Sequence, residues 1–513
     1  MSQETNQQKP ILILQMQRMG DLVLSYPLCA WLASVFPGAP IWMVGEKIFF
    51  EGLLEISPSV TYFDYADSKL LLKCDFGLII NLSHRREAAI LAGRLNSQRV
   101  IGPYIRPDAG GLAESGNQSS NCPGGILHIG GAWQLYRSSI TSNNRHNLFH
   151  WADLNALDLI SQKVMLRTDW PLPGLSGLNG QEGRVGLFVG ASEPDKRPDP
   201  PFWAGLASRL IRLGAKPVLL GGQADKQLAT EAATLLGSQR SNLCGKFSIK
   251  ELCLFMQKLD LLIVPDTGPM HLAAWLGVPV LNLSMGPVNA WETGPTAPGH
   301  LIMRSSMSCT GCWQCRLPGI PCKRTFTPDK VARVAEAILQ GSGNEINHPE
   351  RLERFKRLNL PGASLWLTER DENGLFNLHP LTDQRGNRLD RSRFWKQFFL
   401  LALGRQEKSG PALDKLAELA APMHGPLGQA MLTQGQALLL SLNRELRNKQ
   451  TSEITRGNRH AALLNPQFWQ NFQPIFRPLS SYTQLSLQNA EFSKEAFAAA
   501  LENLELFVNS LRK

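Results

Sequence analysis

The sequence predicts an α/β protein built on parallel sheets, because short strand-like runs alternate with helix-like runs along most of the chain. The clearest example spans residues 261–283. The apolar run 261–264 is too short for a stable helix and is closed by Pro265, whereas residues 270–276 form a helix readily. Residues 280–283 are again strand-like, so this order predicts a βαβ unit. Parallel sheets bind ligands at the carboxyl ends of their strands, where the loop after the first strand lies.

The first third of the chain alternates in the same way. Its strand-like runs are residues 11–14, 41–44, 60–63, 76–81 and 100–101, and its helix-like runs are 85–95 and 151–164. Glycine, serine, asparagine and proline dominate residues 107–125, which predicts a surface loop. These patterns predict a first α/β lobe over residues 1–167, followed by a linker at residues 168–183.

A second α/β lobe is predicted over residues 184–344. In addition to the unit described above, it contains strand-like runs at 184–189 and 216–220 and helix-like runs at 202–213, 226–236, 249–259 and 327–340. The last of these begins with Thr327, Pro328 and Asp329, which are a cap, a proline at the first position and an acid favourable to the helix dipole.

Residues 345–513 differ in character and are predicted to form an accessory, mainly helical extension. Asn373 and Gly374 lie between two runs of alternating polarity, which is a strong hairpin signal. In the last helix, one face carries Phe497, Leu501, Leu504, Val508 and Leu511. Packing in the extension's own core and binding to a partner both explain such a face.

Composition narrows the class of protein. The chain has 513 residues, enough for two or three domains, and 43% of them are hydrophobic. A net charge of +10 favours an anionic partner, and charge alone leaves nucleic acid, an anionic membrane face and a phosphorylated glycolipid open. The N-terminus lacks the pattern of a secretory signal, and no apolar run reaches the length of a membrane span, which predicts a cytoplasmic protein.

The loop after the strand at 261–264 carries polar residues suited to a phosphate group. Asp266, Thr267 and Gly268 lie at the carboxyl end of the strand, and Pro269 fits the first helical position. The N–H groups and the positive dipole end of a helix favour a diphosphate there, and His271 in the first turn can face the same place. The alternative is structural: Asp266 or Thr267 caps the helix, and His271 packs on its neighbours.

Residues 266–274, Asp-Thr-Gly-Pro-Met-His-Leu-Ala-Ala, resemble the signature of the family 9 glycosyltransferases, the heptosyltransferases of lipopolysaccharide core assembly. Further matches are spread over residues 10–340. They are Gly20, Asp21, Pro27, Arg85, Arg86, Gly102, Pro103, Gly190, Ala191, Ser192, Lys196, Trp203, Gly221, Gly222 and Asp225. The resemblance implies a GT-B architecture, in which two Rossmann-like lobes face a cleft and the second lobe binds the sugar nucleotide.

The resemblance also implies an activity. It is the inverting transfer of a heptosyl or similar sugar from an ADP-activated donor to an anionic glycolipid or glycan, such as a lipopolysaccharide core acceptor. Nucleic acid is then not an expected partner, and the acceptor would bring the protein into peripheral contact with the inner face of the cytoplasmic membrane. Asp21 would be the general base that takes the proton of the acceptor hydroxyl. As a residue at a strand-to-helix turn, Asp21 has the alternative role of a helix N-cap.

The remaining site residues follow from the same resemblance. Lys196 and the Thr267 and Gly268 amides would neutralise the departing diphosphate, although a loop lysine next to Arg197 can also be a solvated surface residue. The predicted donor-binding residues are Lys196, Asp225, Asp266, Thr267, Gly268, Pro269, Met270 and His271. The predicted acceptor-binding residues are Arg18, Arg85 and Arg86.

Metal chemistry has two opposing signals. The sequence contains no Asp-x-Asp pair of the kind that metal-dependent glycosyltransferases use, which predicts transfer without a metal or another cofactor. Cys309, Cys312, Cys315 and Cys322 resemble zinc or iron-sulfur ligands in spacing but fit neither standard pattern. Two rivals to the enzyme therefore stay open: a non-catalytic nucleotide-sugar-binding or assembly module, and a metal or redox protein organised by these cysteines.

Overall fold

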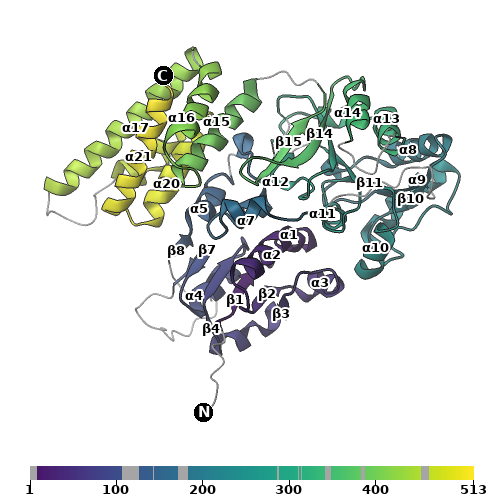
Figure 1. The fold of residues 1–513 in the computed structure, drawn as a ribbon, viewed down its shortest axis with the longest axis horizontal. Helices are drawn as coiled ribbons and strands as arrows, with labels where there is room; N and C mark the ends of the chain where they lie inside the picture. Colours follow the sequence, from purple (N-terminus) through teal and green to yellow (C-terminus); the bar gives the residue numbers. More distant parts are fainter. Residues whose placement is uncertain are drawn as a thin grey trace. The chain divides into compact units, whose positions relative to one another are not determined.

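The chain forms two compact units, and each combines two stretches that are far apart in sequence (Figure 1). The first unit comprises residues 1–71 and 149–385, and the second comprises 72–148 and 386–513. The computed structural model describes residues 8–106, 126–141, 144–171, 183–285, 288–309, 311–312, 315–340, 348–382, 387–423, 425–451 and 461–512. The predicted loop at 107–125 and residues 172–182 of the predicted linker lie outside this part.

Parallel strands begin the first unit. β1 (Ile11–Leu14), β2 (Ile41–Gly45) and β3 (Thr61–Asp64) lie in the order β3-β2-β1 and pair in parallel. Helices α1 (Met19–Leu24) and α2 (Tyr26–Val35) connect β1 to β2. These bounds confirm the strands predicted at 11–14, 41–44 and 60–63.

The second sheet belongs entirely to the first unit. Its strands are β9 (Arg184–Phe188), β10 (Lys216–Leu220), β11 (Leu261–Pro265), β12 (Val280–Ser284), β13 (Leu301–Ser305), β14 (Ala363–Arg370) and β15 (Phe376–Pro380). They lie in the order β10-β9-β11-β12-β13-β14-β15, and the first five are parallel. This is the order of a doubly wound sheet, in which the direction of the chain reverses between β9 and β11. The prediction of an α/β fold with parallel sheets is confirmed.

Helices between the strands supply the core of this sheet. They are α8 (Pro200–Arg212), α9 (Lys226–Leu236), α10 (Ile249–Met256), α11 (Gly268–Trp275) and α13 (Pro328–Leu339). Trp203 of α8 is fully buried against the strands. The Thr327 side chain accepts a hydrogen bond from Lys330 N at 3.4 Å, so the predicted cap of α13 is confirmed.

The predicted hairpin is the pair β14 and β15. The Asp371 carboxylate accepts hydrogen bonds from Asn373 N at 2.9 Å and Leu375 N at 3.0 Å, which shapes the turn. Gly374 has a φ of 74°, a conformation that favours glycine. β14 also pairs antiparallel with β13. The hairpin therefore extends the second sheet, a role that the sequence did not reveal.

The second unit joins part of the first predicted lobe to the C-terminal helices. Its early elements include β4 (Asp75–Phe76), β5 (Leu78–Asn81), α4 (Arg86–Arg94), β6 (Asn96–Ser97), β7 (Val100–Ile105), β8 (Leu127–Gly130) and α5 (Ala132–Ser139). Its late helices include α15 (Asn387–Ala402), α16 (Gly410–Ala420), α17 (Pro426–Thr451), α20 (Arg477–Asn489) and α21 (Lys494–Ser510) (Figure 1). The side-chain amide of Asn489 bonds both backbone groups of Ile129, at 2.7 and 3.1 Å, and so ties α20 to β8.

Aromatic side chains pack the helical extension together. The rings of Trp395 and Phe507 stack with centroids 5.5 Å apart, which joins α15 to α21. Phe497, Leu504 and Val508 are buried as well. The apolar face of the last helix is therefore core, which confirms the packing alternative for these residues. Among the helices that the structure describes, none combines the length and the apolar character that crossing a membrane requires.

One predicted helix is wrong over most of its length. Residues 151–164 form only the short α6 (Trp151–Leu154) and the start of α7 (Gln162–Leu166), with turns between them. The physical reason is that polar side chains here serve long-range contacts. Asp153 is 1% exposed and binds Arg370, which lies more than two hundred residues later in the chain. Helical propensity is a weak preference that such tertiary contacts override.

Candidate functional site

The candidate site lies at the carboxyl ends of β9 and β11. The loop after β9 carries Lys196, in the 3₁₀ helix η4 (Pro194–Lys196), and the loop after β11 carries residues 266–268. The strand order reverses between these two neighbours, so their following connections run to opposite sides of the pair. Open α/β sheets bind ligands in the crevice at such a reversal. The fold thus brings Lys196 and Asp266 to the place where a ligand is expected.

The start of α11 differs from a capped helix. Thr267 occupies the N-cap position with an extended backbone, but its side chain makes no cap hydrogen bond. The Asp266 carboxylate instead accepts a hydrogen bond from the Thr293 hydroxyl at 3.0 Å. Neither residue therefore has the capping role that the structural alternative gave it. Pro269 and Met270 are buried, and both pack within the first turn.

Groups around Asp266 shift its pKa in opposite directions. Its pKa is raised to about 6, mainly because the protein withdraws the carboxyl from water, and the negative charges of Asp21 and Glu193 add to this. The positive charge of Lys196 and the Thr293 hydrogen bond act in the other direction. Asp21 and Lys196, far apart in sequence, therefore both lie within electrostatic reach of Asp266.

A close approach of two glycines brings α1 to α11. A Cβ atom on Gly20 would lie 3.1 Å from the Gly268 Cα, and one on Gly268 would lie 2.8 Å from the Met19 Cε. A side chain at Gly20 would press on the Gly268 backbone, whereas a side chain at Gly268 would first meet the movable end of the Met19 side chain. The first turns of both helices therefore lie together, and Asp21 stands in one of them.

The environment of Asp21 separates its two predicted roles. Arg18 holds the N-cap position of α1 and is exposed, while Asp21 is the third helical residue. Its backbone oxygen accepts hydrogen bonds from Ser25 Oγ at 2.9 Å and Gln15 Nε2 at 3.3 Å. The helix divides at Ser25, and Pro27 lies in the first turn of α2. Arg18 and Ser25 hold the N-cap positions of α1 and α2, so Asp21 is not the N-cap of either helix.

The loop after β9 is tied down by ion pairs. The Lys196 side chain is only 12% exposed, and its Nζ lies 3.1 Å from Glu193 Oε1, so Lys196 is not a solvated surface lysine. Asp225 accepts hydrogen bonds from Arg197 Nη1 at 3.1 Å and Gly222 N at 2.9 Å. These contacts make Asp225 a link between the loops after β9 and β10, and its binding of the donor stays a prediction.

The first unit contains two buried histidines near the site: His271 in α11 and His150 at the N-cap position of α6. His150 Nδ1 accepts a hydrogen bond from Ala152 N at 3.2 Å, so its Nε2 carries the proton and donates to the Gly294 oxygen at 3.0 Å. His271 lines a small pocket with Trp170, Trp275, Val23, Pro27, Ala274, Thr296 and Ala297. Burial lowers the pKa of each histidine to about 3, so both are neutral at physiological pH.

Comparison with known proteins finds a family match over the middle of the chain. Residues 159–319 match the family described as glycosyltransferase family 9 (heptosyltransferase). We refer to residues 159–319 as the family 9 segment because of this match. Lipooligosaccharide heptosyltransferase 2 of Campylobacter jejuni subsp. jejuni serotype O:2 is 31% identical over 165 residues, which are 31% of this chain and 51% of that protein. The chain spans about half the length of the curated relatives it matches.

Two solved structures align with the chain at low sequence identity. A family 9 glycosyl transferase from Veillonella parvula aligns over 65% of this chain and 98% of its own, with a TM-score of 0.47 and 19% identity. TibC from enterotoxigenic E. coli, described as an iron-containing dodecameric glycosyltransferase, aligns over 65% of this chain and 80% of its own, with a TM-score of 0.39 and 14% identity.

The family 9 segment also contains most of the cysteine cluster. The eight cysteines that the structure describes are thiols, and Cys309, Cys312 and Cys315 are partly exposed. In the described ranges, no three His, Cys, Asp or Glu side chains gather closely enough to hold a metal ion. A zinc or iron-sulfur site needs four ligands in a fixed geometry, so the described residues do not fit such a group.

Other residues near the site escaped the sequence analysis. Thr293 lies in the family 9 segment, whereas His150, Asp153 and Arg370 lie outside it. They are scattered over the chain and form no motif, so no local signal could identify them. Arg85 and Arg86, predicted to bind the acceptor, are exposed at the start of α4 in the second unit, and their role stays a prediction.

Buried neutral histidines predict acid sensitivity. His150, His271 and His300 each have a pKa lowered from 6.5 to about 3 in the folded chain. Their contribution to stability is complete above pH 6.5 and is lost as the pH falls toward 3. For each histidine, the free energy of unfolding should fall by about 2 kcal/mol between pH ~8 and pH ~5. The raised pKa of Asp266 increases the free energy of unfolding by about 1 kcal/mol over the same interval. The net effect of acidification is therefore a loss of stability.

Denaturant unfolding at both pH values would measure this effect. His300→Leu is the sharpest comparison, because both ring nitrogens of His300 are buried without a hydrogen-bond partner. Leucine should leave the free energy of unfolding at neutral pH unchanged or raised. It should also reduce the difference in that free energy between the two pH values by the contribution of one histidine. Equal unfolding free energies at the two pH values would contradict the prediction.

Proposed function

We propose that this chain is an inverting glycosyltransferase that moves a heptosyl or similar sugar from an ADP-activated donor to an anionic glycolipid. One observation carries the proposal: Asp21 and Lys196, from the two separate stretches of the first unit, both act on Asp266 at the strand-order reversal. A carboxylate suited to accept a proton and an ammonium suited to a phosphate then lie around one ligand-binding crevice. The family 9 segment and its heptosyltransferase relatives support the choice of sugar.

The chemistry assigns one task to each residue. Asp21 takes the proton of the acceptor hydroxyl as its oxygen bonds to the anomeric carbon. The bond from that carbon to the diphosphate oxygen breaks, and its electron pair leaves with ADP. Attack from the face opposite the leaving group inverts the anomeric centre. Lys196 and the N-terminal end of α11 stabilise the negative charge that develops on the diphosphate.

The Asp266 carboxylate has a supporting role. Its ionised form attracts the ammonium group of Lys196. An ionised carboxylate this close to the donor also repels phosphate, so its charge must be balanced by Lys196. Arg18, Arg85 and Arg86 are our candidates for the anionic groups of the acceptor, which we place at the inner face of the membrane.

A donor screen tests the activity directly. The purified chain, treated with a chelator, is given ADP-heptose, other ADP-sugars and UDP-sugars with a lipopolysaccharide core acceptor, and the released nucleotide is measured. We expect ADP release from ADP-heptose only when the acceptor is present, without added metal. Binding of ADP-heptose without turnover would favour the non-catalytic module. Activity that returns only when iron or zinc is restored would favour a metal-dependent protein.

A further inference from the structure

We propose that Arg370 is a positioning residue of the candidate site, which holds the loop 293–297 so that Thr293 keeps its bond to Asp266. This inference rests on the proposed function only for its consequence in turnover. Arg370 lies at the end of β14, outside the family 9 segment. The hairpin would therefore take part in the active site of the chain without contacting the substrate.

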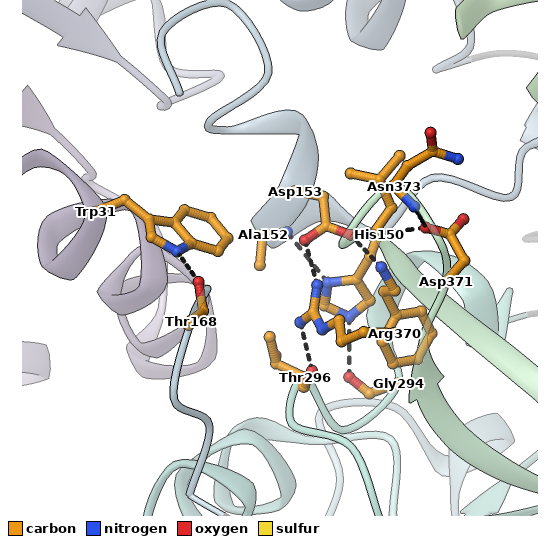
Figure 2. Close-up of polar contacts among 12 residues, drawn as sticks. Trp31, His150, Ala152, Asp153, Thr168, Gly294, Thr296, Arg370, Asp371 and Asn373 are labelled. Carbon is orange, nitrogen blue, oxygen red and sulfur yellow. Dashed lines mark hydrogen bonds and ion pairs between the residues drawn. The ribbon is translucent and has the colours of Figure 1, made fainter. Parts of the chain in front are cut away.

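Arg370 contacts the loop directly. Its Nη2 donates to the Thr296 oxygen at 2.7 Å, and its Nη1 donates to Asp153 Oδ1 at 2.7 Å (Figure 2). The guanidinium carbon lies 3.9 Å from the centre of the Trp170 ring. The second Asp153 oxygen accepts from Phe376 N at 2.7 Å, so the carboxylate that holds Arg370 is itself held by β15. The guanidinium is thus fixed from three sides.

A second contact holds the same loop. His150 Nε2 donates to the Gly294 oxygen at 3.0 Å, and Figure 2 shows this bond beside the Arg370 bond to Thr296. The carbonyls of Gly294 and Thr296 are therefore both bound by side chains from outside the family 9 segment, the buried His150 before it and the partly buried Arg370 after it. At Gly294 even a Cβ atom would lie 2.7 Å from the Ala290 oxygen, so the backbone has little room to shift.

The clamped loop begins at Thr293, which is also the last residue of α12 (Ala290–Thr293). Because the Thr293 hydroxyl bonds Asp266 at 3.0 Å, a shift of the loop would break that bond. Losing it would raise the pKa of Asp266 further above its ordinary value. The other charged groups that act on Asp266 are Lys196, Asp21 and Glu193.

The test compares Arg370→Gln with Thr293→Val in the full chain. Valine has the shape of threonine but cannot donate to Asp266, whereas the Gln variant leaves Thr293 in place and releases its loop. The pKa of Asp266 is read by NMR of aspartate carboxyl carbons, assigned with Asp266→Asn, so the readout does not depend on activity. Each variant should raise that pKa by about one unit, the size expected for a lost hydrogen bond to a charged group.

The double variant decides between positioning and simple structural support. If Arg370 acts through Thr293, Asp266 should have the same pKa in the double variant as in Thr293→Val alone. The acidic limb of the pH profile of turnover should shift by the same amount. An unshifted Asp266 in a folded Arg370→Gln chain, or shifts that add, would overturn the proposal. Arg370→Lys decides the matter if the Gln variant does not fold, because lysine keeps the charge but not the two-pronged geometry, and it should produce part of the shift.

The two proposals fail differently. If no donor is turned over but the Asp266 pKa responds as expected, the proposed function fails and the positioning role stands. If turnover is present and the Asp266 pKa is insensitive to Arg370, the positioning role fails alone.

Discussion

Replacing Asp21 with asparagine should lower sugar transfer by roughly 100- to 10,000-fold while ADP binding stays near that of the native chain. An amide has the volume of the carboxyl group but cannot take the acceptor proton. The helix should survive, because the hydrogen bonds from Gln15 and Ser25 reach the backbone oxygen of Asp21 and not its side chain. The carboxyl is also not the N-cap of α1.

Single-turnover kinetics and ADP calorimetry on the same preparation would separate chemistry from binding. Asp64→Asn is a matched control, because it removes the same charge from the same unit at the end of β3. A native rate for Asp21→Asn under conditions where chemistry limits turnover would remove Asp21 as the base. If Asp21→Asn does not fold, Asp21→Ser and Asp21→Glu replace it in the same comparison.

The second large effect concerns the diphosphate. Lys196→Ala should weaken ADP binding by about 1 to 3 kcal/mol, the scale of a lost charge-assisted hydrogen bond. Lys196 is mostly withdrawn from water, so its charge is less screened than that of an exposed lysine. The variant should also raise the pKa of Asp266, because Lys196 is the strongest of the groups that lower it.

Calorimetry in the presence of a chelator measures the ADP affinity. Lys250→Ala is the control, since it removes one positive charge from a 55% exposed side chain of the same unit and should leave the affinity unchanged. Unchanged binding by Lys196→Ala would exclude Lys196 from the phosphate site. An absolute magnesium requirement in the native chain would contradict the whole electrostatic account.

Local patterns were sufficient for the elements that build the site. Residues 11–14, 216–220 and 226–236 form β1, β10 and α9 with the predicted bounds. Each has a strong period or a clear boundary, such as Gly237 in the left-handed conformation after α9. The loop at 266–268 could be placed at a strand end because short apolar runs closed by proline or glycine leave few alternatives.

Sequence alone determined that this is an α/β chain with a family 9 signature and that Asp266 and Lys196 follow strands of one parallel sheet. Only the tertiary structure decided that β14 joins that sheet, that residues 151–164 are not one helix, and that Arg370 holds the loop beside Thr293. The physical reason is the distance along the sequence over which each kind of interaction acts. Periodicity and caps act over a few neighbouring residues, whereas the bonds of Asp153 and Arg370 join segments more than two hundred residues apart and leave no pattern in either.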